Sequence, residues 1–231
     1  MNDNNIQHII DQAKLLNHTI EIISNIRSGK EAVVYRVLLD GNLVAMKLYK
    51  HPEERMFNNA NQYLEGKYYK AASHRKAMVK GNKFSKRLKH NNWIEREFFM
   101  LERLYERGAR IPKPLLQIDN AVFMELLGDD EHVAPRLCDV RLSKDEAQKA
   151  FKQIIDSVIM FWNDGIVHAD LSEYNVLWWN NKPYIIDFPQ AIDRRTHPHP
   201  HEILDRDLHN ITKFFSKYTD VDVAEIRSKF V

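Results

Sequence analysis

The chain alternates between short apolar runs typical of strands and longer segments whose apolar residues recur at helical spacing. An amphipathic pattern near the start predicts an N-terminal helix within residues 1–18. Between residues 19 and 50, three β-branched runs are separated by turns at residues 27–30 and 40–42. The second turn contains Asp40-Gly41, and Asp-Gly between two apolar runs is a strong hairpin signal. We therefore predict an antiparallel sheet preceded by a helix.

Helical patterns dominate the second half of the chain. A helix is expected to begin at residues 91–92 and to end near Gly108. Two strand-like runs follow, and the capping-box sequence Ser143-Lys144-Asp145-Glu146 then opens a long amphipathic helix that should stop at Gly165. Short strands and one or two further helices complete the chain. This order of elements predicts an α+β fold.

Composition narrows the class of protein. The 231 residues are 44% hydrophobic, and 34 Lys+Arg against 32 Asp+Glu leave a net charge of only +2. A single cysteine, Cys138, excludes an internal disulfide framework and indicates a reducing, cytoplasmic setting. We expect no membrane association, because no apolar run approaches the ~18 residues of a span and the polar start lacks the features of a secretory signal.

Positive charge is concentrated in one segment. Residues 66–90 contain no acid, and their basic residues are Lys67, Lys70, Arg75, Lys76, Lys80, Lys83, Lys86, Arg87 and Lys89. Like charges at this density favour a flexible loop over residues 67–90. The interleaved aromatic residues leave RNA binding open as an alternative.

The most informative segment is His168-Ala169-Asp170-Leu171-Ser172-Glu173-Tyr174-Asn175, which spells H-x-D followed by Asn, and Asp187 ends an apolar strand twelve residues later. In phosphoryl transfer, one Asp orients the attacking hydroxyl while an Asn and a second Asp hold Mg²⁺ against the phosphates. Taken one at a time, these residues have ordinary structural explanations: His168 as a core histidine, Asp170 and Asn175 as turn residues, and Asp187 as a helix or strand cap. Their combined spacing favours phosphoryl transfer.

The N-terminal half supplies partners for this chemistry. Val44-Ala45-Met46-Lys47 places a lysine on a strand, as in the V-A-I-K pattern whose lysine holds the α- and β-phosphates. Glu97 shares the inward-facing stripe of the next helix, whereas the competing Glu95 does not, so Glu97 is the expected partner of Lys47. Ser28-Gly29-Lys30 lies in a turn just before this strand, where backbone N–H groups and an ammonium group can approach phosphate.

Together these motifs resemble the RIO kinases, an atypical protein kinase family with a reduced kinase fold. The resemblance spans nearly the whole chain and also rests on Met124-Glu125-Leu126-Leu127-Gly128, Ala134-Pro135-Arg136-Leu137 and Asp205-Arg206-Asp207. Ala-Pro-Arg-Leu looks like the type-one branch, whereas Phe188-Pro189-Gln190 is nearer to type two. Because few residues precede the first strand, no type-two winged helix is expected, and we expect a type-one-like or prokaryotic member.

The resemblance implies a two-lobed, kinase-like α+β fold with a reduced C-lobe: an N-lobe over residues 19–124 and a C-lobe over residues 125–231. ATP and Mg²⁺, or Mn²⁺ in its stead, would lie between the lobes. The implied catalytic residues are Asp170 and Asp187, and the implied metal ligands are Asn175 and Asp187. The nucleotide would contact Ser28, Gly29, Lys30, Lys47, Glu97 and the backbone of Glu125 and Leu127. Similar proteins are autophosphorylated in the basic loop, which makes Ser73 and Ser85 candidates.

Two departures from ordinary kinases bear on mechanism. Ala169 replaces the arginine of H-R-D, which removes the usual receiver of an activation-loop phosphate. Pro189 replaces the glycine of D-F-G, and its fixed φ should restrict movement of Asp187. The 44 residues after Asp187 are too few for a long peptide groove.

The sequence thus favours an ATP-dependent kinase or ATPase that transfers phosphate to Ser or to its own Asp, in a role linked to ribosome maturation. One alternative is a small-molecule phosphotransferase of the aminoglycoside or choline kinase kind, which uses the same motifs. Another is a nucleotide-sensing assembly factor that binds rRNA or a pre-ribosomal particle through the basic loop.

Overall fold

The computed structural model describes residues 3–50, 83–129 and 131–230, without the side chains of residues 3 and 83–93. The chain divides into two compact units. Of the described residues, the first unit contains 3–50, 83–99 and 113–126, and the second contains 100–112 and 127–230. The mixed helix and sheet content agrees with the predicted α+β class.

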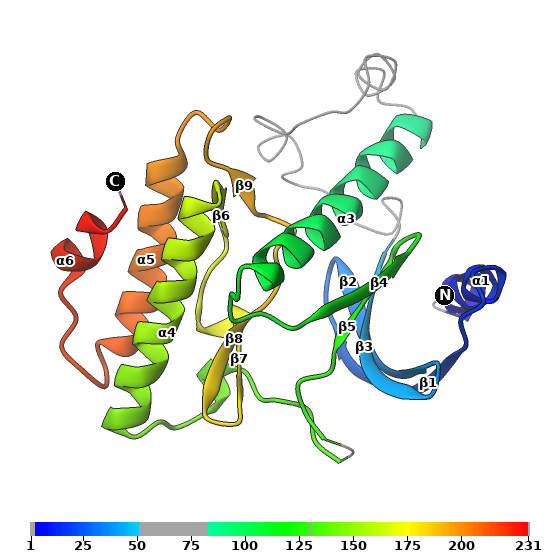
Figure 1. Cartoon of the computed structure of the whole chain (residues 1–231), viewed down its shortest axis with the longest axis horizontal. Coiled ribbons are helices and arrows are strands. Elements are labelled where there is room, and N and C mark those ends of the chain that lie inside the picture. Colours follow the sequence, from blue (N-terminus) through cyan, green and yellow to red (C-terminus); the bar gives the residue numbers. More distant parts are fainter. Residues whose placement is uncertain (1–2, 51–82, 130, 231) are drawn as a thin grey trace. The chain divides into compact units, whose positions relative to one another are not determined.

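A five-stranded antiparallel sheet forms the body of the first unit, in the order β1-β2-β3-β5-β4 (Figure 1). Its strands are β1 (Ile20–Ser28), β2 (Ala32–Leu39), β3 (Asn42–Tyr49), β4 (Pro114–Ile118) and β5 (Ala121–Glu125). Asp40 and Gly41 connect β2 to β3 with φ values of 51° and 79°. Positive φ at both central residues defines a type I′ turn, so the predicted hairpin is confirmed.

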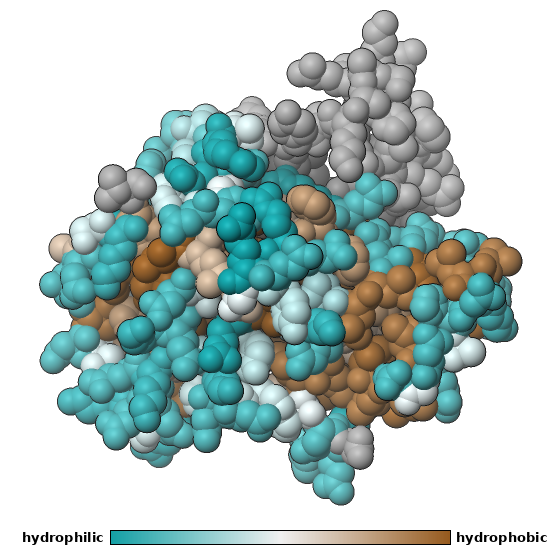
Figure 2. All heavy atoms as spheres, viewed as in Figure 1, coloured by the Kyte–Doolittle hydropathy of each residue, from teal (hydrophilic) through white to brown (hydrophobic). Residues whose placement is uncertain are grey.

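Helix α1 (Asp3–Leu15) packs on one face of this sheet. Its Ile9 and Ala13 are fully buried in a core that includes Val44, Met46 and Leu48 of β3. Figure 2 shows apolar residues in brown on the face of this unit that is in view, over α1 and the neighbouring strands. The predicted N-terminal helix is therefore confirmed, and it covers the apolar face of the sheet in the first unit.

Helix α3 (Lys83–Glu106) begins earlier than expected. The predicted start at residues 91–92 is wrong, and residues 83–90, assigned to a flexible loop, are helical. Lys, Arg and Leu have high helix propensity, and repulsion between like charges one turn apart costs only a few tenths of a kcal/mol, so the basic charge does not prevent a helix. The remainder of the predicted loop, with Ser73, lies outside the described residues, as does the side chain of Ser85.

The second unit is mainly helical (Figure 1). Besides the end of α3, it contains η2 (Leu137–Asp139), α4 (Lys144–Asn163), β6 (Ile166–Val167), η3 (Glu173–Asn175), β7 (Val176–Trp179), β8 (Lys182–Ile185), β9 (Ile192–Asp193), α5 (Pro200–Phe215) and α6 (Val223–Ser228). The predicted capping box opens α4, because Ser143 Oγ accepts from the Glu146 N–H and Glu146 Oε2 accepts from the Ser143 N–H. Within the described ranges, no helix has the length and apolarity needed to cross a bilayer.

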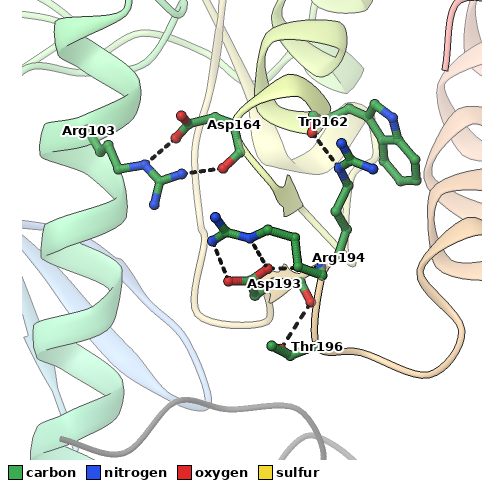
Figure 3. A network of polar contacts seen from close by, with 7 residues as sticks. Arg103, Trp162, Asp164, Asp193, Arg194 and Thr196 are labelled. Carbon is green, nitrogen blue, oxygen red and sulfur yellow. Dashed lines mark hydrogen bonds and ion pairs between the residues drawn. The ribbon is translucent and has the colours of Figure 1, made fainter. Parts of the chain in front are cut away.

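A buried carboxylate joins the end of α4 to α3 within the second unit. The Asp164 side chain is only 4% exposed, and it pairs with Arg103 of α3 and with Arg107, which directly follows that helix. Figure 3 shows Arg103 reaching both the carboxylate and the backbone carbonyl of Asp164. Nearby, the Arg194 Nε–H donates to the Trp162 carbonyl oxygen at 2.8 Å, and its guanidinium lies over the Trp162 ring. These contacts fix the turn that leads from α4 into β6.

Replacing Asp164 by Ala should lower the free energy of unfolding by about 2 kcal/mol, because Arg103, whose side chain is 29% exposed, would lose a charged hydrogen-bond partner. Asp156→Ala, on the same helix, removes an exposed pair with Lys152 and should cost no more than about 0.5 kcal/mol. Urea denaturation followed by tryptophan fluorescence measures both, since Trp162, Trp178 and Trp179 lie in this unit. Equal effects of the two substitutions would contradict this assignment.

Candidate active site

Strand β3 directs Lys47 away from the core beneath α1. Side chains alternate along a strand, so Val44, Met46 and Leu48 enter that core while Lys47 lies on the opposite face. There the Lys47 Nζ donates to Glu97 Oε1 of α3 at 2.9 Å. The Lys47 and Glu97 side chains are 13% and 2% exposed, so this ion pair is buried. The structure thus brings together the two residues that the sequence paired, and Glu95 is exposed.

The turn between β1 and β2 contains the residues expected near phosphate. The Gly29 N–H donates to the Ala32 carbonyl at 2.8 Å, so one of the backbone N–H groups of this turn has a partner within the turn. Lys50 braces the turn by donating from Nζ to the Gly29 carbonyl at 2.6 Å. A Cβ atom at position 29 would lie 3.3 Å from the Ala32 oxygen, so the tight turn favours glycine there. Ser28, Gly29 and Lys30 are all exposed, and their contact with phosphate stays a prediction.

Glu125 and Leu127 are the residues expected to contact adenine through their backbone. In each of them, one backbone group already has a hydrogen-bond partner within its own unit. In the first unit, the Glu125 N–H donates to the Lys113 carbonyl at 2.8 Å, and the Glu125 carboxylate accepts from the Lys113 N–H. In the second unit, the Leu127 carbonyl accepts from the Ala134 N–H at 2.8 Å. The contact of Glu125 and Leu127 with a base stays a prediction.

The catalytic-loop motif folds back on itself. Asn175 Nδ2 donates to both the backbone carbonyl and the carboxylate Oδ2 of Asp170, at 2.8 and 3.1 Å. His168 is 2% exposed, and its Nε2 lies 3.0 Å from the Ile186 carbonyl while its Nδ1 lies 3.3 Å from the Asp170 N–H. A carbonyl only accepts, so Nε2 carries the proton and Nδ1 accepts from Asp170. His168 therefore holds the backbone of this loop in a neutral, buried form.

Asp187 lies beside this loop in an uncommon backbone conformation. Its φ is 74°, in the left-handed region, and strain of this kind concentrates at functional sites. The next residue, Phe188, is buried against the rings of His168 and Phe161. Partial burial raises the pKa of the Asp170 carboxyl, and the negative charge of Asp187 raises it further. The structure thus brings together Asp170, Asn175 and Asp187 in the second unit.

These residues fit a hard divalent cation. Because Asn175 gives its Nδ2 hydrogens to Asp170, its Oδ1 is directed away from Asp170 and is available as an oxygen ligand. Two interacting carboxylates gain from a cation that offsets their repulsion, and oxygen ligands are those preferred by Mg²⁺. The chemistry of Asn175 and Asp187 therefore suits the metal-ligand role predicted for them, and that role stays a prediction.

A second strained residue lies inside the catalytic loop. Ala169 is buried with a φ of 67°, which costs about 1–2 kcal/mol for a residue with a Cβ atom. Asp207 of α5 accepts from the N–H groups of Ala169 and Leu171 at 2.7 and 3.1 Å. Arg206 Nη2 donates to the Ala169 carbonyl at 2.5 Å, and Asn210 Nδ2 donates to the Leu171 carbonyl at 3.1 Å. Helix α5 therefore holds the loop in its strained form.

Asp207 had no assigned role in the sequence prediction, although the pattern contained a signal. On α5, Asp207 falls within the apolar stripe of Leu204, Leu208 and Ile211, and all four are buried. An acid at the apolar face of a helix indicates a buried hydrogen-bonding partner. The distant partners, the N–H groups of the catalytic loop, are not visible in the sequence.

Residues 33–228 match the family model described as the RIO domain. This chain belongs to the RIO domain family. It is 33% identical over 212 residues to the human serine/threonine-protein kinase RIO1, covering 91% of this chain and 36% of that protein. It is 34% identical over 194 residues to the RIO-type serine/threonine-protein kinase Rio1 of Haloferax volcanii, covering 83% of this chain and 62% of that protein. The chain thus spans little more than a third of its human relative.

The fold of this RIO domain is also found in solved structures. A crystal structure of a Rio2 kinase–ADP/Mg²⁺–phosphoaspartate complex from Chaetomium thermophilum matches with a TM-score of 0.61 and 22% identity. The match covers 91% of this chain and 62% of that chain. Together with the elements described above, it supports a kinase-like fold with a small C-terminal part, as the sequence predicts.

Burial raises the pKa of Asp207 to about 7 from an ordinary value of 3.8, so between pH 4 and 7 the folded state binds more protons than the unfolded state. The free energy of unfolding should therefore fall as pH rises through this window and level off above it. Asp207→Asn removes this dependence and leaves one buried N–H unpaired, at a cost of about 1–3 kcal/mol. The loss relative to wild type should be greater at pH 5 than at pH 8.

Denaturation of wild type, Asp207→Asn and the control Asp205→Asn across this range measures the effect. Asp205 lies on the same helix but is half exposed and pairs with Arg227. A pH dependence that survives in Asp207→Asn and disappears in Asp205→Asn would contradict the assignment.

Proposed function

We propose that this RIO domain is an ATP- and Mg²⁺-dependent serine kinase or ATPase. The observation that carries the proposal is the pair of hydrogen bonds from Asn175 to Asp170, which orients the carboxylate and leaves an amide oxygen for a cation. The buried Lys47–Glu97 pair supports the proposal, because a lysine held by a carboxylate is the usual phosphate contact in kinases. The names of the relatives, serine/threonine-protein kinases, favour this function over a small-molecule phosphotransferase.

The residues of the chain suit the individual steps. Asp170 takes the proton of a serine hydroxyl as its oxygen attacks the γ-phosphorus, and ADP leaves; with water as the nucleophile, the same step is ATP hydrolysis. The raised pKa of Asp170 makes it a better base. Lys47 binds the α- and β-phosphates, with Ser28 and Lys30 as further contacts. Asn175 and Asp187 would hold Mg²⁺, which would supply positive charge to neutralise the phosphates.

Three finer points complete the proposal. The phosphoryl acceptor is either a serine, including one in a protein substrate, or an aspartate of this chain. The protein acts in the cytoplasm, and its role is linked to ribosome maturation. The Rio2 kinase complex from Chaetomium thermophilum supports the aspartate, because that complex contains a phosphoaspartate. The basic residues between 67 and 89 support rRNA or a pre-ribosomal particle as a partner, since Lys and Arg bind phosphate backbones.

Incubation with γ-³²P-labelled ATP should label wild type, whereas Asp170→Asn should lose at least 100-fold in labelling while still binding ATP by calorimetry. Hydroxylamine separates the two acceptors, because it cleaves an acyl phosphate on aspartate but leaves phosphoserine intact. Asp156→Asn, at an exposed position on α4, is the control and should keep wild-type labelling. Undiminished labelling of Asp170→Asn would remove Asp170 from its proposed role.

The basic segment should bind single-stranded RNA with strong salt dependence. Replacing Lys67, Lys70 and Lys76 by Gln should reduce the slope of log K against log salt by about 0.7 for each phosphate that is no longer neutralised, or about 2 for all three. Lys213→Gln together with Lys217→Gln, at exposed positions near the end of α5, should leave the slope unchanged. Fluorescence anisotropy with a labelled oligoribonucleotide between 50 and about 200 mM salt tests this. An unchanged slope in the triple variant would exclude the segment as the RNA-binding surface.

A further inference from the structure

An aromatic side chain is exposed at the apex of the catalytic loop. Tyr174 lies in η3, in the turn closed by a hydrogen bond from the Asn175 N–H to the Ser172 carbonyl at 3.0 Å. Its side chain is 55% exposed, although it directly precedes Asn175 and is only four residues from Asp170. The turn that carries the candidate metal ligand therefore also presents an aromatic ring to solvent.

The ring is held from one side only. The Arg136 guanidinium lies 5.7 Å from the centre of the Tyr174 ring, within the range of a cation–π contact. Arg136 is itself fixed by two hydrogen bonds to the Asp139 carboxylate, at 2.8 and 3.2 Å. It also forms a β-bridge with Leu177, and the Trp178 N–H donates to the Pro135 carbonyl at 2.8 Å. One face of the ring is thus braced, while the remaining surface stays available for contact.

The braced ring favours an apolar partner over an anion. Asp139 pairs with Arg136 through both oxygens, so the cation beneath the ring is already neutralised. The available surface of Tyr174 is therefore mainly aromatic carbon with a hydroxyl at its edge, which suits packing against an aromatic or large aliphatic side chain.

The connection that follows Asp187 is short, which leaves little chain there for recognition of the acceptor. Only residues 188–199 separate Asp187 from α5, and part of this connection is the short strand β9. Tyr174 and Asp170 are four residues apart, so their Cα atoms are separated by at most about 14 Å. An extended peptide advances about 3.3 Å per residue, so a side chain contacting Tyr174 would lie within about five positions of a serine at Asp170.

We propose that Tyr174, braced by Arg136 and Asp139, is a docking platform for the acceptor protein, which it selects through one aromatic or large aliphatic residue close to the phosphorylated serine. This inference rests on the proposed kinase function and extends it to substrate choice. Tyr174 is a specificity residue in this account and takes no part in the reaction at phosphorus.

A peptide library with one central serine tests the proposal. Each of the five positions on either side is fixed in turn as one of the 20 amino acids, and transfer from γ-³²P-labelled ATP is measured. Wild type should favour aromatic or large aliphatic residues at one position. Tyr174→Ala should lose this preference, with kcat/KM for the best peptide lower by about five- to tenfold, mainly through KM. Tyr174→Phe should retain the preference, since the ring is kept.

The controls separate this inference from the proposed function and from loss of structure. Hydrolysis of ATP without peptide should stay within about twofold of wild type in Tyr174→Ala, and Tyr105→Ala, at another exposed tyrosine of the same unit, should alter neither readout. An active wild type whose peptide profile is unchanged by Tyr174→Ala would overturn the docking role alone. Weaker binding of a labelled oligoribonucleotide by Tyr174→Ala, in place of a changed peptide profile, would also overturn the docking role alone. A folded wild type that neither binds nor turns over ATP would overturn both proposals.

Discussion

The candidate active site depends on the hydrogen bonds that Asp207 accepts from the catalytic loop. Ala169 must adopt a left-handed conformation to turn His168 inward and Asp170 outward, and that conformation is unfavourable for a residue with a Cβ atom. Asp207 offsets the cost by binding the N–H groups on both sides of Asp170, and Arg206 binds the intervening carbonyl. Burial of the Asp207 carboxyl is itself unfavourable, because it raises the pKa of this group. The geometry of the loop is therefore maintained at the expense of some stability of the second unit.

The same conflict between stability and chemistry appears at Asp170. Its carboxyl is partly buried beside Asp187, and both effects raise its pKa. A site selected for stability alone would separate two carboxylates or neutralise one of them. Here the amide of Asn175 gives both its hydrogen bonds to Asp170, which leaves the Asn175 oxygen and Asp187 for a cation. The repulsion between Asp170 and Asp187 is therefore the feature that a bound cation would relieve, and such a cation would stabilise the second unit.

Sequence reasoning succeeded at several features whose signal is local. The type I′ turn at Asp40-Gly41, the capping box of α4 and the strand position of Lys47 each follow from residues adjacent in sequence. It failed at the start of α3, because charge repulsion was judged stronger than helix propensity. The loop-binding role of Asp207 was also missed, since its partners lie more than 35 residues earlier in the chain. The pairing of Lys47 with Glu97 crosses 50 residues, yet it was predictable because helical periodicity already distinguished Glu97 from Glu95.

The histidine–proline run of residues 197–201 leads into α5, the helix that carries Asp207. His197 Nδ1 accepts from the His199 N–H, His199 Nδ1 lies 3.0 Å from Glu202 Oε1, and His201 lies against the ring of Trp162. Each histidine thus has a separate structural partner, as expected for a segment in which proline holds the chain extended. Pro200 is the first residue of α5, where its fixed φ suits a helix and its missing N–H has no cost. Asp207 follows seven residues later, about two turns along the same face. Pro200 and Asp207 therefore lie on the same side of α5, and inserting one residue between them would turn Asp207 by about 100° relative to the histidine–proline run.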